Sequence, residues 1–164
     1  MYVDFLLTTA EVSGALLGFV GVVLVLGRRS EGVLSNRDRS GLFHLVYAAT
    51  GALFYSLLIY LLVTTIDQSV LAWRIGVGLC TLHIAFGVSK AIREGKSGDN
   101  RLNALARNGL SVLTFAVIGA NLAIILGYLL DFAAVAFAVS ITLMLAVAVS
   151  YFIPFILGKA DDAT

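Results

Sequence analysis

The chain has 164 residues, 60% of them hydrophobic and 13% charged, with a mean hydropathy of +0.99. A water-soluble domain of this size does not need so many apolar residues for its core. The composition therefore excludes that class and predicts an all-α membrane protein. The formal net charge of +1 gives no indication of a nucleic-acid partner. The single cysteine, Cys80, excludes a disulfide within the chain.

Five apolar stretches, each near the ~20 residues that cross ~30 Å of hydrocarbon, predict a bundle of five transmembrane helices in one domain, residues 1–164. They cover approximately residues 5–27, 42–66, 70–92, 110–130 and 132–157. The turn between the last two is short. Gly127 is expected to end the fourth helix and Asp131 to cap the fifth, and without this turn the count falls to four.

The distribution of Lys and Arg predicts the orientation. Ten of the eleven cations lie at one side of the predicted bundle: Arg28, Arg29, Arg37, Arg39, Lys90, Arg93, Lys96, Arg101, Arg107 and Lys159. The positive-inside rule makes that side cytoplasmic, so the N-terminus is expected outside and the C-terminus inside. Three aromatic residues lie where an outer belt is expected: Tyr2, Trp73 and Tyr128. The basic loops either set this topology only or also bind anionic lipid or a cytosolic partner.

The first span places the carboxylate of Glu11 above three glycines, Gly14, Gly18 and Gly21. At about 100° per residue, these four residues share one face of a helix within roughly 80°. Small residues on one face allow two membrane helices to approach closely, so this face is predicted to pack against another helix. Glu11 is either an ion, proton or pore-lining site, or a structural ion pair or neutral carboxyl group.

The third span contains a second charge, Arg74, about four residues from its outer end. Glu11 is expected at a similar depth from the same side, about six residues into its span. Because an unpaired charge inside the bilayer is costly, a contact between Glu11 and Arg74 is predicted. The alternative is that Arg74 extends to the outer head groups.

Polar or small side chains recur along single faces of the other spans. The third span, for example, carries Gly76 and His83 on one stripe. The residues expected to form a hydrogen-bond network or a narrow polar path are His44, Tyr55, His83, Thr114 and Asn121. Helix packing with interhelical hydrogen bonds is the first interpretation of these stripes, and a polar cavity is the second.

Catalytic and cofactor motifs are not found in the sequence, so an enzyme, a metal site and a cofactor are not predicted. His44 and His83 lie on neighbouring spans, but their levels differ by ~8 Å along the helix axis, which suits two axial haem ligands poorly.

Four short segments carry a resemblance. They are Ala10-Glu11-Val12-Ser13-Gly14, Gly27-Arg28-Arg29, Asp38-Arg39 and Trp73-Arg74-Ile75. Through them the first half of the chain resembles a loose group of small bacterial multi-pass membrane proteins with no established activity. The resemblance implies a recurrent unit and a bacterial host, hence the inner (plasma) membrane, and it assigns no catalytic residue.

The sequence therefore favours a homo-oligomeric membrane protein with a channel-like or ion-permeation role that involves Glu11. The competing hypothesis is a non-conducting scaffold or sensor whose basic cytoplasmic loops engage a cytosolic or membrane partner. The two hypotheses differ in the surroundings of Glu11, which are a solvated path in the first and a dry pair with Arg74 in the second.

Overall fold

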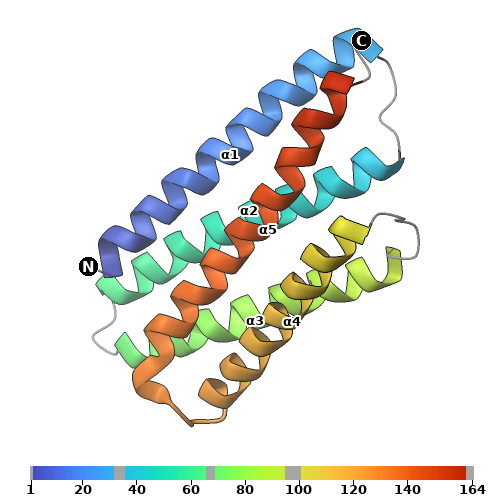
Figure 1. Cartoon of the computed structure of the whole chain (residues 1–164). Helices are drawn as coiled ribbons and strands as arrows, with labels where there is room; N and C mark the ends of the chain where they lie inside the picture. The colour runs from blue at the N-terminus through green and yellow to red at the C-terminus, as the bar shows by residue number, and fades with distance from the viewer. Residues whose placement is uncertain (1, 32–35, 66–68, 95–100, 162–164) are drawn as a thin grey trace. The chain divides into compact units, whose positions relative to one another are not determined.

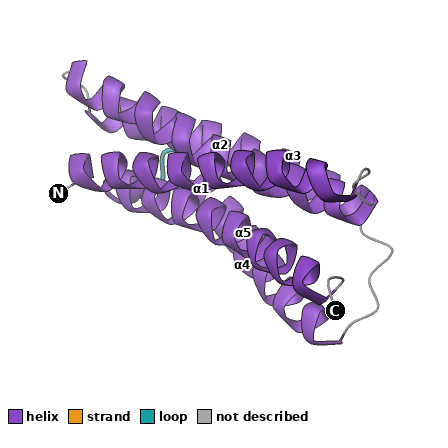
Figure 2. Ribbon diagram, turned by 90° about the horizontal axis from the view of Figure 1, so that it is seen from above, coloured by secondary structure: helices purple, strands orange, loops and turns teal. Residues whose placement is uncertain are grey.

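The computed structural model describes residues 2–31, 36–65, 69–94 and 101–161 (Figure 1). They form five α-helices and one short 3-10 helix, η1: α1 (Tyr2–Glu31), α2 (Asn36–Thr65), α3 (Ser69–Glu94), α4 (Arg101–Ile125), η1 (Leu130–Phe132) and α5 (Ala133–Asp161). Figure 2 shows only these helices and the short loop between α4 and η1 in the described part of the chain. The predicted all-α class and the five helices are confirmed.

Four of the helices are long and apolar enough to cross a membrane. Their apolar segments are Tyr2–Val22, Arg39–Thr65, Val70–Arg93 and Leu130–Ile153. In α4 the apolar part among the residues with described side chains, Ser111–Ile125, has 15 residues and covers about 22 Å at the rise of an α-helix. The prediction of a fifth spanning helix over 110–130 included the residues after Ile125, which are not part of α4. The chain thus has the helices of a multi-pass membrane protein.

The chain divides into two compact units, each of which is described by itself. The first contains residues 1–58 and 144–164, and the second contains residues 59–143. Helices α2 and α5 contribute residues to both units. The single domain over residues 1–164 stays a prediction.

In the first unit, α1, α2 and the C-terminal part of α5 meet at small side chains. Ala48, Ala49 and Ala148 are buried together, and Leu17 and Val147 pack against them. Alanines at this meeting point bring three backbones close together, which is how helices associate in a lipid environment. Aromatic pairs extend the contact, with Phe19 edge-to-face on Phe152 at 5.2 Å between ring centroids, and His44 stacked on Tyr151 at 5.1 Å.

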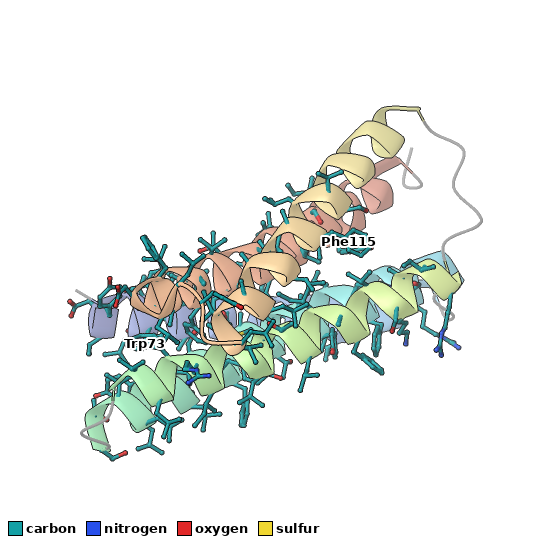
Figure 3. The ribbon with its side chains drawn as sticks, turned by 90° about the horizontal axis from the view of Figure 1, so that it is seen from below. Trp73 and Phe115 are labelled. Carbon is teal, nitrogen blue, oxygen red and sulfur yellow. The ribbon has the colours of Figure 1, made fainter. Side chains whose placement is uncertain are left out.

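In the second unit, α3 and α4 lie side by side, and the first part of α5 packs with them. Gly76 of α3 is the point of closest approach. A Cβ atom at this position would lie 2.8 Å from side-chain atoms of both Ile59 and Phe137. Trp73, one turn earlier, packs on Phe137 with 5.7 Å between ring centroids and lies near the end of the unit where α4 turns into α5 (Figure 3). Gly76 therefore permits three helices to meet.

The turn after α4 is closed by backbone hydrogen bonds. Gly127 has a φ of 97°, and the N–H groups of Gly127 and Tyr128 donate to the carbonyls of Ile124 and Ala123. This is the Schellman arrangement, and it confirms that Gly127 ends the fourth helix. The prediction that Asp131 caps the fifth helix is wrong, because Asp131 lies inside η1, whose preceding residue is Leu129 with a φ of 56°.

Candidate intramembrane charge site

One face of α1 is the buried face. Leu6, Thr9, Ser13 and Val20 are all at most 5% exposed. The two hydroxyl groups are satisfied within the helix, because Thr9 donates to the carbonyl of Phe5 and Ser13 to that of Thr9, both at 2.7 Å. Such bonds to the preceding turn allow hydroxyl side chains to be buried without a partner on another helix.

The opposite face of α1 holds the predicted charge and glycines. Glu11, Gly18 and Gly21 are exposed, and Gly14 is half-buried. A Cβ atom added to any of these three glycines would meet no other atom within 4 Å. The glycines that were predicted to allow close helix packing thus have open space beside them, and no described helix of their own unit lies against them.

This exposed face extends further than the sequence prediction. Its members repeat in steps of three and four residues, and we call them the open face of α1: Asp4, Leu7, Glu11, Gly14, Gly18, Gly21 and Val25. The spacing is that of the two core positions of a heptad repeat, the pattern by which one helix faces another along its whole length. Asp4, Leu7 and Val25 were missed as members of this face, although the heptad spacing from Glu11 and Gly14 is present in the sequence.

Glu11 lies inside the apolar segment of α1, Tyr2–Val22 as far as its side chains are described. It is nine residues after Tyr2 and eleven before Val22, which places it about 13 Å from the start of the segment. At this depth a carboxylate that faces hydrocarbon costs at least about 2.5 kcal/mol on insertion scales.

Arg74 has a partner within its own unit. Its Nη2 donates a hydrogen bond of 2.9 Å to the carbonyl oxygen of Ile125, the last residue of α4. Carbonyls in the last turn of a helix lack partners within the helix, and the C-terminal end carries partial negative charge, so a guanidinium group is well suited to it. Arg74 therefore caps α4.

The predicted contact between Glu11 and Arg74 stays a prediction, because the two residues belong to different units. Arg74 lies four residues after the start of its apolar segment and Glu11 nine residues after the start of its own.

The predicted polar network is divided between the two units. In the second, Asn121 donates a 2.9 Å hydrogen bond from Nδ2 to the hydroxyl of Ser140, which donates in turn to the carbonyl of Ala136. Asn121 and Ser140 are fully buried, so this bond joins α4 to α5 in the core. Thr114 is buried and His83 half-buried in the same unit, whereas His44 and Tyr55 belong to the first. A continuous polar path stays a prediction.

The basic residues lie mostly outside the described side chains. Arg39 is exposed near the start of α2. The other predicted loop cations are Arg28, Arg29, Arg37, Lys96, Arg101 and Arg107, and the described residues do not include their side chains. Among the residues that the structure describes, no group of three or more His, Cys, Asp or Glu side chains is placed to hold a metal ion.

Comparison with protein-family models, with curated proteins and with solved structures finds no match to this chain.

Proposed function

We propose that the protein is a subunit of a homo-oligomeric membrane assembly, in which the open faces of several α1 helices meet and Glu11 lines an ion path. The observation that supports this proposal most is the exposure of Glu11 nine residues into a membrane-length segment of α1. A carboxylate at that depth should face protein or water and not hydrocarbon. Assembly of copies through this face satisfies that requirement.

The glycines provide the packing surface for such an assembly. Gly14, Gly18 and Gly21 leave open space on the side of the helix where Glu11 lies. Two copies of α1 can approach closely along this ladder, with contacts made by backbone atoms. Leu7 and Val25, exposed at 37% and 61%, extend the contact toward both ends.

Glu11 gives the proposed path its chemistry. A ring of carboxylates favours cations, as in other cation-conducting pores. In the charged form Glu11 would replace part of the hydration shell of a cation that passes the narrow part of the assembly. Its neighbours on the open face, Leu7 and Gly14, carry no polar side chain, so in this proposal Glu11 is the group that meets the ion at this level.

The test combines a measurement of oligomeric mass with a measurement of cation flux. Native mass spectrometry in nanodiscs should give a closed oligomer, and liposomes should conduct cations at a rate that Glu11→Gln lowers at least about tenfold, the effect of ~1.4 kcal/mol at the barrier. Asp131→Asn, which neutralises an exposed carboxylate outside α1, is the matched control and should leave the flux unchanged. A monomer, or flux that Glu11→Gln does not alter, would contradict the proposal and favour the non-conducting scaffold.

A further inference from the structure

The turn between α4 and α5 is unusual in its side chains. Four large apolar residues within seven positions are more than half exposed: Leu126, Tyr128, Leu129 and Phe132, at 74%, 69%, 59% and 57%. No charged residue occurs between Arg107 and Asp131. The segment between α3 and α4 has the opposite composition, Gly-Lys-Ser-Gly-Asp-Asn over residues 95–100. Turns in water favour such polar residues, and an exposed apolar cluster marks a surface that contacts something other than water.

The backbone of this turn is suited to an apolar environment. The N–H groups of Leu126, Gly127 and Tyr128 donate to carbonyls of α4, and that of Phe132 donates to the carbonyl of Leu129. The Ile125 carbonyl, at the end of α4, accepts the guanidinium hydrogen bond from Arg74. Irregular backbone is tolerated at membrane depth only where its polar groups find partners inside the protein. This turn meets that condition for the groups that end α4.

The length of α4 also supports a position of the turn inside the membrane. Its uncharged part, from Asn108 to Ile125, has 18 residues and covers about 27 Å, which is slightly less than a hydrocarbon layer ~30 Å thick. A turn that lay further out in water would bring Arg107 closer to the hydrocarbon. If the turn itself lies within the membrane boundary, residues 126–130 complete the apolar layer and Arg107 stays at the other surface.

We infer that the α4–α5 turn is embedded in the lipid bilayer. Its exposed apolar side chains lie among the parts of the acyl chains just below the head groups, and Asp131 lies at the head groups. The occupant of this surface is thus lipid. The charge of Asp131, which is exposed at the start of α5, limits the depth, because a carboxylate is costly in hydrocarbon and well solvated among head groups. Arg74 provides the hydrogen bond that water would otherwise give to the end of α4.

Tryptophan fluorescence in lipid vesicles can test this depth. Trp73 is the only tryptophan, so Trp73→Phe provides a background into which single probes are placed. Tyr128→Trp and Leu126→Trp put a probe at two exposed positions of the turn. Leu82→Trp puts a probe near the middle of α3, where Leu82 is 71% exposed, and serves as the deep reference.

The expected result is a blue-shifted emission for both turn probes, with quenching by phosphatidylcholine that carries a nitroxide just below the head group and little quenching by iodide in the buffer. The Leu82→Trp probe should be quenched most by a nitroxide near the chain end. Strong quenching by iodide would place the turn in water, and protection from both quenchers would mean that protein covers it. Either outcome overturns the inference.

Should Trp73→Phe fail to fold, a second route uses a nitroxide on Leu126→Cys in a Cys80→Ala background. Its collision rates with oxygen, which concentrates in lipid, and with a water-soluble nickel chelate report the same depth. Higher accessibility to oxygen is expected, and higher accessibility to the chelate overturns the inference.

Discussion

The core of the second unit and the open face of α1 both contain glycine and a charged residue, yet they differ in what surrounds them. Gly76 lies where Ile59 and Phe137 leave no room for a Cβ atom, and Arg74 donates to the Ile125 carbonyl. Gly18 has open space beside it, and Glu11 is exposed. A glycine in a membrane helix therefore indicates a helix contact within the chain only where a neighbouring side chain occupies the space that its Cβ atom would take. The open face of α1 is the surface on which we propose that a further helix packs.

The largest effect is expected from Gly76→Val. A Cβ atom at 2.8 Å from Ile59 and Phe137 forces both side chains to move, and overpacking of this kind costs about 3 kcal/mol. Unfolding of the purified protein in mild detergent would measure the loss. Gly78→Val is the matched control on the same helix, since a Cβ atom there meets nothing within 4 Å. Equal losses for the two variants would show that Gly76 is not a special contact.

A smaller loss is expected from Arg74→Leu, which removes the cap of α4. A hydrogen bond from a charged group contributes about 1.5–3 kcal/mol, part of which the apolar leucine recovers in lipid. Faster amide exchange at residues 122–128 should accompany the loss of stability, because the end of α4 then opens more often. Arg74→Gln, which keeps a donor, should retain part of the protection. If the exchange rate in this segment is unchanged in both variants, Arg74 does not cap α4.

The smallest effect on the subunit itself is expected from Gly18→Leu. The side chain enters open space and leucine is a better helix former than glycine, so the free energy of unfolding of the monomer should not fall. The same change blocks close approach of a second α1 and should shift the oligomer toward monomer in native mass spectrometry. Val12→Leu, at an exposed position outside the open face, should leave the mass distribution unchanged. A stable oligomer with Gly18→Leu would refute assembly through this face.

Much of the fold could be predicted from the sequence, because length and hydropathy determine which segments can cross a bilayer. The five helices and the end of the fourth at Gly127 follow from that reasoning. The end of the predicted span over 110–130 could not be derived in this way. Residues 126–130 are apolar but do not continue α4, and hydropathy does not distinguish an apolar turn from an apolar helix.

The candidate site was less predictable than the fold. The shared face of Glu11 and the glycines follows from helical periodicity alone. Periodicity does not reveal which face a neighbour covers, so it assigned small-residue faces to Gly76 and Gly18 alike, although only Gly76 is closely packed. The partner of Arg74 was also beyond sequence reasoning, because a main-chain carbonyl at a helix end leaves no signature in residue types.

The short apolar part of α4 also affects how the protein enters the membrane during synthesis. Because α4 carries Ser111, Thr114 and Asn121 within its apolar part, we expect the bilayer to hold it less firmly than a fully apolar helix. The segment that follows, Leu130–Ile153, is the most apolar of the chain. Because Gly127 folds the chain back between them, we expect α4 and α5 to insert together as a hairpin.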